Sequence, residues 1–189
     1  MSTPFKIDLA GKVAVVTGGG GILCSVMAEA LADCGAKVAI LDLRKEAADQ
    51  VAAAIKAKGG VAMGVACNVL ERASIEAAEK EVRATYGACD ILINGAGGNN
   101  PKGTTSNEQM SKADLTNTDP NVKTFFDLDP KGIEFVFNLN FLGTLLPTQV
   151  FSRAMAENGK GVIINISSMN AFKPLTKIPA YSAAKAAVS

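Results

Sequence analysis

The amino-acid sequence predicts an α/β protein in which a doubly wound parallel β-sheet carries helices on both faces, giving three α/β/α layers. Short apolar runs, typical of strands buried on both faces, alternate with helical segments along the chain. Glycines 18–21 close the first apolar run just where a helix should begin. Right-handed crossovers then leave few topologies, and we expect the strand order 3-2-1-4-5.

The first half of the chain follows this alternation closely. Gly35 and the pair Gly59-Gly60 end its first two helices, as glycine commonly does. We expect strands over 13–17, 37–41, 61–66 and 91–94, and helices over 22–33, 46–58 and 72–86.

The second half contains a long segment, 97–129, that breaks the rhythm. It is rich in Asn, Thr, Lys, Pro and Gly and carries little hydrophobic periodicity. A loop of this length inside a compact domain is usually functional or disordered. We therefore treat 97–129 as an inserted loop region within a single domain that spans residues 1–189.

A long helix should follow the inserted loop. Asp129-Pro130 is typical of a helix start, with proline at the first helical position. The helix should cover 133–156, and Pro147 can kink it. A fifth strand over 162–166 and a helix that begins at Ala180 should complete the pattern.

Composition excludes several classes of function. The 189 residues are 48% hydrophobic and 20% charged with a net charge of +1, and there is no basic block, so we expect neither a nucleic-acid nor a membrane partner. Histidine is absent, which excludes Ser-His-Asp and Cys-His catalysis and every His-ligated metal site; we expect no metal. Four cysteines in apolar surroundings and the lack of a signal peptide or membrane span predict a cytoplasmic protein.

The glycine turn is the first candidate binding feature. Glycines let a backbone approach a pyrophosphate at a helix N-terminus, and a tight turn is the simpler interpretation. Four consecutive glycines exceed what a turn needs. Gly18, Gly20, Gly21 and Ile22 are therefore candidate dinucleotide-binding residues.

Two further candidates end the second and third strands. Asp42 can accept hydrogen bonds from both adenosine ribose hydroxyls and repel a 2′-phosphate, or it can cap the next helix. Because Arg44 could favour a phosphate, NAD over NADP is only a preference. Asn68-Val69 could contact the adenine edge or form a simple turn.

The fourth strand ends in Asn94-Gly-Ala96-Gly97, whose small residues leave room for a flat cofactor, although a strand-ending turn would also explain them. Asn140, placed among apolar residues of the long helix, must be paired if it is buried, either by local backbone or by a functional water.

A second group of candidates lies near the end of the chain. Tyr181 and Lys185 would share one face of a helix at a spacing of four. An ammonium stabilises the anionic form of a neighbouring phenol, so Tyr181 could act as a general acid/base. Ser168 follows the fifth strand, from which a loop can aim its hydroxyl at the same place.

With these motifs in order, the chain resembles the Rossmann-like short-chain dehydrogenase/reductase family over nearly its whole length, from Gly11 to Lys185. The resemblance implies that Tyr181 exchanges a proton with the substrate oxygen and that Lys185 assists it and binds the nicotinamide ribose. It further implies that Ser168 holds the substrate carbonyl and that Asn140 positions a water. The cofactor would be NAD, with NADP less favoured.

The chain departs from the family pattern at three places. The glycine turn is one residue shorter than Thr-Gly-x-x-x-Gly-x-Gly, and Leu23 or Cys24 replaces its last glycine. The segment 97–129 is longer than usual. Both features resemble the D-mannonate oxidoreductase (D-fructuronate reductase) branch, which implies a keto or hydroxy sugar acid as substrate. The family's substrate lid is missing, so we expect a chain truncated after the start of the Tyr/Lys helix, with strand 5 an uncovered sheet edge.

Other readings remain open. A polyol or sugar dehydrogenase of the same family, and a non-catalytic dinucleotide-binding scaffold, are the alternatives; the intact proton-relay set argues against the scaffold. The resemblance also implies a homodimer or homotetramer formed through helix 133–156 and the helix from 180 onward.

The inserted loop is expected to wall the substrate pocket. Asn99, Asn100 and Lys102 follow the glycines that end strand 4 and offer amides and an ammonium to a sugar acid. Lys173 and Lys177, between Ser168 and Tyr181, are alternative partners for its carboxylate. A solvated loop is the competing interpretation.

Overall fold

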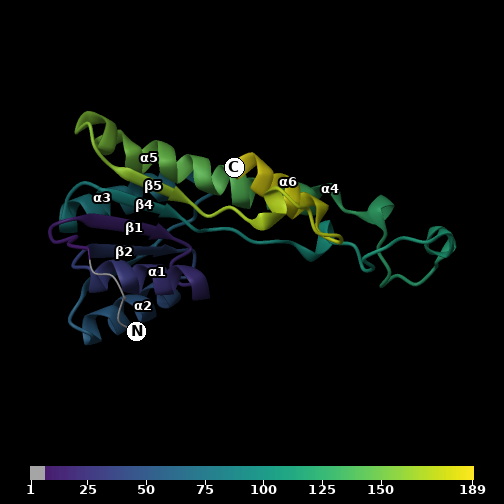
Figure 1. The fold of residues 1–189 in the computed structure, drawn as a ribbon, viewed down its shortest axis with the longest axis horizontal. Coiled ribbons are helices and arrows are strands. Elements are labelled where there is room, and N and C mark those ends of the chain that lie inside the picture. Colours follow the sequence, from purple (N-terminus) through teal and green to yellow (C-terminus); the bar gives the residue numbers. More distant parts are fainter. Residues whose placement is uncertain (1–6) are drawn as a thin grey trace. The chain divides into compact units, whose positions relative to one another are not determined.

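The computed structural model describes residues 7–189, which form two compact units. The sheet unit comprises Met1–Ala96 and Gly143–Ile166, and the tyrosine unit comprises Gly97–Leu142 and Ser167–Ser189. Both units are built from two stretches of chain (Figure 1).

The sheet unit contains a five-stranded sheet in the predicted order β3-β2-β1-β4-β5, and every pair of neighbours is parallel. The strands lie within one residue of their predicted bounds. They are β1 (Val13–Thr17), β2 (Lys37–Asp42), β3 (Val61–Ala66), β4 (Ile91–Asn94) and β5 (Val162–Asn165).

Helices cover both faces of this sheet, which confirms the three-layer prediction (Figure 1). α1 (Ile22–Asp33) and α2 (Lys45–Ala57) pack together on one face, and α3 (Arg72–Tyr86) packs with α5 (Gly143–Glu157) on the other. Burial on two faces explains why β1 is an unbroken apolar run whose five residues are all buried.

The register of the central strands brings their carboxyl ends to the same edge of the sheet. Thr17, the last residue of β1, pairs with Leu41 on one side and with Asn94 on the other. Ligands of doubly wound sheets bind outside the carboxyl ends of the strands, where the strand order reverses. Here the reversal falls between β1 and β4. β5 forms the predicted edge strand, and its four residues are exposed.

The tyrosine unit is mostly short turns and helices. The inserted loop is not featureless, since it contains three single 3₁₀ turns. The elements of this unit are η1 (Pro101–Gly103), η2 (Lys112–Thr116), η3 (Phe125–Asp127), α4 (Pro130–Phe137), the π-turn η4 (Asn138–Leu142), η5 (Met169–Ala171) and α6 (Pro179–Val188).

The prediction of a single helix over 133–156 is wrong in one respect. A π-turn at 138–142 separates α4 from α5. Asn140 lies inside this turn, and its side-chain Nδ2 donates to the carbonyl of Val136 at 2.8 Å. The side chain thus takes the acceptor that a regular helix would offer to the Asn140 backbone N–H, which is consistent with local widening. Pro147, where a kink could have occurred, lies inside the continuous α5.

The start of α4 agrees with the sequence. The carboxylate of Asp129 accepts a hydrogen bond from the Lys131 N–H at 2.9 Å, and Pro130 occupies the first helical position. This cap leaves one fewer backbone N–H unsatisfied at the helix start.

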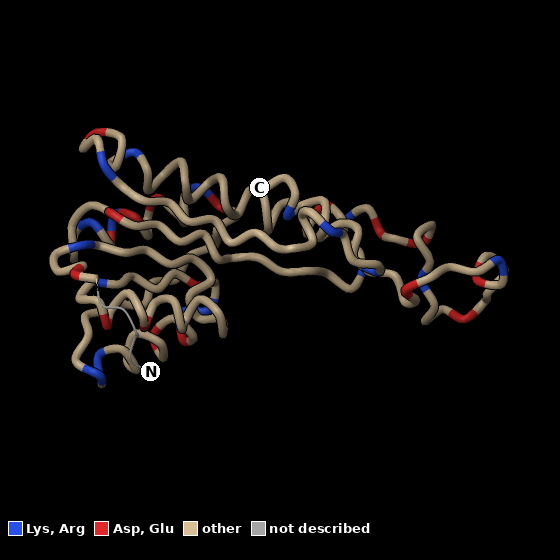
Figure 2. The backbone as a smooth tube through the Cα atoms, in the orientation of Figure 1, with Lys and Arg blue, Asp and Glu red and all other residues tan. Residues whose placement is uncertain are grey.

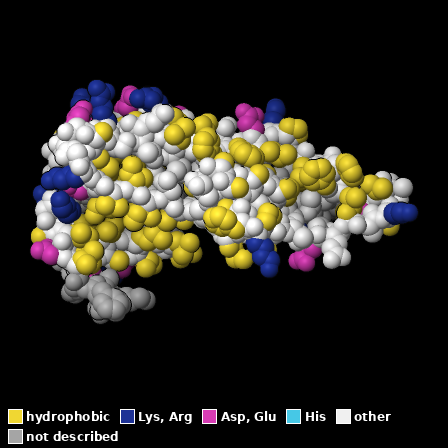
Figure 3. Space-filling model, turned by 45° about the horizontal axis from the view of Figure 1, so that its top comes forward, with side chains coloured by type: hydrophobic (Ala, Val, Ile, Leu, Met, Phe, Trp, Pro, Cys, Tyr) yellow, Lys and Arg dark blue, Asp and Glu magenta, His cyan; other side chains and the backbone are white. Residues whose placement is uncertain are grey.

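Charged residues of both signs occur throughout residues 7–189. Basic and acidic residues are interspersed along both units (Figure 2), and hydrophobic side chains also reach the surface of both (Figure 3). Within residues 7–189, no helix combines the length and the apolar character needed to cross a bilayer. In the same residues, no three His, Cys, Asp or Glu side chains are grouped so that they could hold a metal ion.

Candidate active site

The glycine turn after β1 needs glycine for steric reasons. Gly18 has φ of +64°, and a Cβ there would lie 2.8 Å from the Cα of Ala96. The turn closes through a hydrogen bond from the Gly21 N–H to the Gly18 carbonyl at 3.0 Å. Ile22 starts α1 directly afterwards, and no side chain caps this helix. The first N–H groups of α1 are therefore available to an acceptor such as a phosphate oxygen.

The Asp42 carboxylate binds two backbone segments, the glycine turn after β1 and the chain just after β2. One carboxylate oxygen accepts from the Gly20 N–H and the other from the Arg44 N–H, both at 3.0 Å. A Cβ on Gly20 would lie 2.9 Å from the same carboxylate, so the glycine permits this close approach. Asp42 thus fixes the glycine turn, a role that sequence reasoning missed because it depends on the pairing of β1 with β2.

Asn68 and Val69 lie after β3. The Asn68 carbonyl oxygen accepts from the Leu70 N–H at 3.1 Å, and its amide donates to Glu71 at 2.8 Å. Val69 is buried. The side chain of Asn68 therefore forms a turn, the simpler of the two interpretations, and its amide already has a partner.

The end of β4 is locked to the end of β1 by a buried residue that the sequence analysis did not select. The hydroxyl oxygen of Thr17 accepts from the N–H groups of Gly95 and Ala96, at 3.1 and 3.2 Å. Asn94 is buried and donates to Thr148 and Asn165, at 2.8 and 2.9 Å. The threonine that precedes the glycine turn was the available signal, since a buried hydroxyl at the end of a strand requires a partner.

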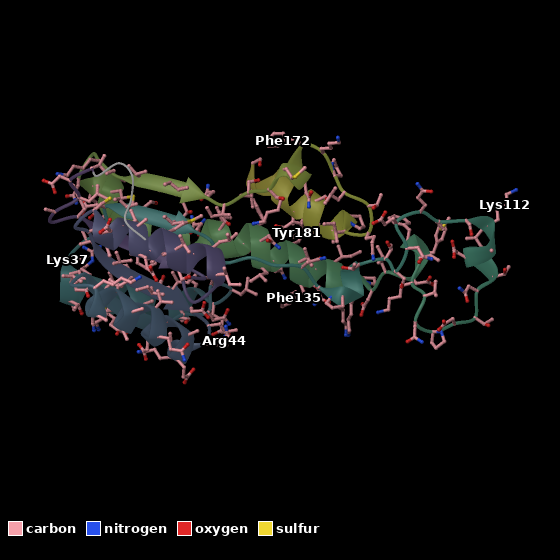
Figure 4. The ribbon with its side chains drawn as sticks, turned by 60° about the horizontal axis from the view of Figure 1, so that its bottom comes forward. Lys37, Arg44, Lys112, Phe135, Phe172 and Tyr181 are labelled. Carbon is pink, nitrogen blue, oxygen red and sulfur yellow. The ribbon has the colours of Figure 1, made fainter. Side chains whose placement is uncertain are left out.

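In the tyrosine unit, α6 carries Tyr181, which Figure 4 labels, and Lys185, whose Nζ lies over the Tyr181 ring, so the two share one face as their spacing predicts. Lys185 Nζ lies 5.8 Å from the centroid of the Tyr181 ring. The Lys185 side chain is only 5% exposed, while Tyr181 is half-buried.

Asn140 is completely buried and paired with backbone, which was one of the two alternatives. Its Nδ2 donates to the carbonyls of Gly98 and Val136, at 2.7 and 2.8 Å, and its oxygen accepts from the Gly98 N–H at 3.2 Å. A Cβ on Gly97 would lie 2.7 Å from this oxygen and 3.2 Å from Lys185 Nζ. Asn140 and Lys185 therefore border the same glycine, which brings two of the four predicted catalytic residues together.

Ser168 begins the turn η5. Its Oγ accepts from the Asn170 N–H at 3.2 Å, so the hydroxyl hydrogen remains free to be donated. The preceding Ser167 was not a candidate, yet its Oγ donates to the Lys185 carbonyl at 3.1 Å. This bond links the loop after β5 to α6. In the sequence, the adjacent pair Ser167-Ser168 was the one feature that could have indicated it.

The polar residues that open the inserted loop already bind one another. Asn99 donates to the Thr104 hydroxyl at 3.0 Å, and the Asn100 oxygen caps η1 by accepting from the Lys102 N–H at 2.9 Å. Lys102 Nζ lies 3.6 Å from Asp129. Within residues 7–189, the ammonium groups of Lys173 and Lys177 form no hydrogen bond or ion pair. Both groups could therefore bind a carboxylate.

Two of the buried cysteines, Cys67 and Cys89, have thiols that burial makes less acidic. Burial raises the pKa of the Cys67 thiol to about 11 and that of Cys89 to about 12. A thiol reacts as its thiolate, so neither group is a nucleophile near neutral pH.

Comparison with known proteins identifies a family that matches this chain. A model of the short chain dehydrogenase family matches residues 12–189. An uncharacterized oxidoreductase of Haemophilus influenzae is 57% identical over 182 residues, which is 96% of this chain and 62% of that protein. The uncharacterized oxidoreductase UxuB of Bacillus subtilis is 46% identical, over 98% of this chain and 65% of that protein.

A solved structure agrees with these relatives. It is a Haemophilus influenzae protein provisionally named a D-mannonate oxidoreductase, with bound NAD. It matches with a TM-score of 0.89 and 55% identity, over 96% of this chain and 63% of that one. The chain thus spans less than two thirds of the length of the relatives it matches. The matched family model and these relatives show that the chain belongs to the short-chain dehydrogenase family.

Proposed function

We propose that this protein is an NAD-dependent oxidoreductase that transfers a hydride between nicotinamide and a carbonyl or alcohol carbon, and that its substrate is a sugar acid of the D-fructuronate/D-mannonate type. The observation that carries the proposal is the arrangement of Tyr181, Lys185 and Asn140 in one unit. A buried ammonium lies beside a half-buried phenol, and Asn140 and Lys185 meet at Gly97. A non-catalytic scaffold has no need of this set.

The sheet unit fits the cofactor. The uncapped start of α1 offers N–H groups to a pyrophosphate, and Gly18 to Gly21 keep side chains out of its way. Asp42 stands at the end of β2, where an acid selects NAD by repelling a 2′-phosphate. Ile22, Val69, Asn94, Ala96 and Gly97 are proposed to border the dinucleotide, as is Asn68. NADH, when bound, supplies the hydride.

The proton is proposed to come from Tyr181. As a carbonyl is reduced, its oxygen gains negative charge, and the Tyr181 hydroxyl donates a proton to it. Lys185 favours the phenolate that remains and also binds the nicotinamide ribose. Ser168 has its Oγ lone pair engaged by the Asn170 N–H and its hydrogen free, so it can donate to the same substrate oxygen. Asn140 is proposed to orient a water between Lys185 and solvent.

Recognition of the sugar acid is proposed to use the inserted loop. Asn99 directly follows Gly98, and Lys102 lies three residues further on, in the stretch that leads away from the end of β4. Lys102 is exposed and only loosely paired with Asp129 at 3.6 Å, so exchange of that carboxylate for a substrate carboxylate is inexpensive. Lys173 is the alternative carboxylate partner.

The wider organisation is proposed as well. We infer that the two units act as one dinucleotide-binding domain, and that the protein works in the cytoplasm as a homodimer or homotetramer. The contacts would be made by 133–156 and by the helix from 180 onward.

The test is oxidation of NADH, followed at 340 nm, with a panel of substrates. Keto sugar acids should be reduced with a kcat/KM well above that of the matched neutral keto sugars, while polyols should be oxidised poorly with NAD. A preference for polyols would make the protein a polyol dehydrogenase instead. No turnover with any carbonyl or alcohol, despite tight NADH binding, would support a scaffold.

A cofactor comparison tests the role of Asp42. The unmodified protein should bind NADH more tightly than NADPH, and Asp42→Asn, which keeps the shape but removes the charge, should narrow that difference. Asp42→Ala should also weaken NADH binding itself, because the Gly20 N–H loses its acceptor. Equal affinity of the unmodified protein for both cofactors would contradict the NAD assignment.

A further inference from the structure

Lys177 has a backbone conformation that its side chain disfavours. Its φ is +70°, and among residues 7–189 no other residue besides glycine has a positive φ. In this left-handed region Cβ crowds the following carbonyl oxygen, so glycine and asparagine are common there and other residues are not. Such a residue persists only where surrounding structure holds it in place.

A hydrogen bond from the inserted loop holds Lys177. The Thr105 N–H donates to the Lys177 carbonyl at 2.9 Å, although the two residues are far apart in the sequence. The same part of the inserted loop packs against neighbouring helices, since η1 contacts both α4 and α6. A Cβ on Gly103 would lie in ordinary contact, 3.6 Å from the Ala180 Cβ. The inserted loop is thus fastened to the chain that leads into α6.

Lys177 comes immediately before the helix that carries the tyrosine. Ile178 is the N-cap residue of α6, and Pro179 is its first helical residue. The first turn is closed by the bond from the Ser182 N–H to the Ile178 carbonyl at 3.1 Å. The direction in which the chain leaves Lys177 therefore sets where α6 starts, and with it the position of Tyr181.

We propose that Lys177 and Thr105 form a latch through which the inserted loop positions Tyr181. The latch consists of the left-handed backbone of Lys177 and the hydrogen bond that its carbonyl accepts from the Thr105 N–H. Lys177 is then a positioning residue whose backbone matters, whereas its ammonium is dispensable. This inference rests on the proposed function only in assuming that Tyr181 is the acid/base.

A substitution series at Lys177 separates the backbone from the charge. Lys177→Gly and Lys177→Asn remove the ammonium and accept a positive φ, so they should keep kcat within about threefold of the unmodified protein. Lys177→Val disfavours the positive φ most and should lower kcat by about tenfold, with little change in the KM for NADH. If Lys177→Gly and Lys177→Asn lower kcat as much as Lys177→Val does, while Lys177→Arg leaves kcat unchanged, then the positive charge is what matters. That result would overturn the latch.

A matched pair at Thr105 tests the latch without relying on catalysis. Thr105→Pro removes the N–H donor, and the preceding Thr104, with φ −125° and ψ 130°, already has the extended conformation that precedes proline. Thr105→Ala keeps the N–H and removes only the hydroxyl, which donates to the Asn107 carbonyl. The readout is hydrogen exchange of the Ser182 amide, with thermal melting to confirm folding.

We expect Thr105→Pro to accelerate that exchange by at least about tenfold and Thr105→Ala to leave it within about twofold. Equal exchange in the two variants overturns the latch, whether or not the protein reduces any carbonyl. Absence of turnover in the unmodified protein, with the exchange difference intact, would count against the proposed function and leave the latch standing.

Discussion

The two units differ in how they hold their candidate residues. In the sheet unit, each candidate lies at or after the carboxyl end of a strand, and the register of parallel neighbours fixes its place: Gly20 reaches Asp42, and Gly95 reaches Thr17. In the tyrosine unit, the candidates depend on irregular backbone. Asn140 sits in a π-turn, and Tyr181 follows the positive φ of Lys177.

Under the proposed function, this difference would separate cofactor binding from proton transfer. A cofactor site needs backbone N–H groups at a fixed edge, and a regular sheet supplies them at little cost. Acid/base chemistry needs ionisable and polar side chains that are buried close to one another. Regular helices and strands rarely produce this arrangement without irregular backbone nearby. We therefore expect substitutions in the sheet unit to affect mainly NADH binding and those in the tyrosine unit to affect mainly turnover. Gly97 and Lys185, which are also proposed to contact the dinucleotide, can affect both.

The largest expected effect is that of Tyr181→Phe. Losing the proton donor should lower kcat by roughly 10²–10⁴-fold, and NADH affinity should change little. Tyr86→Phe is the matched control, because Tyr86 is the other tyrosine of the chain and lies at the end of α3. Steady-state kinetics and NADH titration would be compared for both. Near-normal turnover by the Tyr181→Phe variant would show that Tyr181 is not the general acid/base.

Paired glycine substitutions test the same division at the backbone. Gly97→Ala should lower kcat by about a hundredfold, because its Cβ would lie 2.7 Å from the Asn140 oxygen and displace it or Lys185. Gly18→Ala should instead weaken NADH binding by about tenfold, through its positive φ and its contact with Ala96.

Each glycine has a control in the chain. Gly98→Ala would place its Cβ in ordinary contact, 3.7 Å from Leu139, and Gly11→Ala has a positive φ with nothing within 4 Å. Both should retain function. The division of roles fails if Gly97→Ala weakens NADH binding and leaves kcat intact.

Asn140→Ala should destabilise the protein as well as slow it. The substitution leaves the carbonyl and N–H of Gly98 and the carbonyl of Val136 without their partner, and a buried unpaired group costs about 1–3 kcal/mol. Asn138→Ala, in the same π-turn, removes an amide for which the described residues show no hydrogen bond. Urea unfolding should show a loss for Asn140→Ala well above that for Asn138→Ala; equal losses would mean that the three bonds contribute nothing.

The last prediction concerns stability alone, through the thiols of the sheet unit at high pH. Their pKa values are raised to about 11 for Cys67 and about 12 for Cys89 from a usual 9.0. Above pH 9 the unfolded chain loses protons that the folded chain keeps, so stability falls as pH rises, by roughly 1.4 kcal/mol per pH unit for each thiol. Urea unfolding between pH 8 and 10.5 would measure this slope. Replacing both cysteines with Ala should flatten it, and an unchanged slope would assign the loss to other groups.

The sequence-based predictions were right where hydrophobic periodicity and turn-forming or helix-ending residues determine the structure. The bounds of the strands, the turn at Gly18 and the helical face shared by Tyr181 and Lys185 all follow from local pattern. The π-turn could not be predicted, because the apolar spacing around Asn140 is that of an ordinary helix and the widening depends on one side-chain bond to Val136.

Contacts between distant segments were the other limit. That Asp42 would bind Gly20, and that Thr105 would hold Lys177, depends on which segments meet in the fold. Positive φ at a lysine has no sequence signature, since it is imposed by the neighbouring structure and opposed by the residue's own preference.

The most direct test of the account is isotopic. The protein would be given a keto sugar acid and NADH carrying deuterium at the transferring position of nicotinamide C4. The account predicts one deuterium on the new carbinol carbon of each product molecule, with Tyr181→Phe forming product far more slowly. Product without deuterium, or product formed equally fast by the Phe variant, would contradict it.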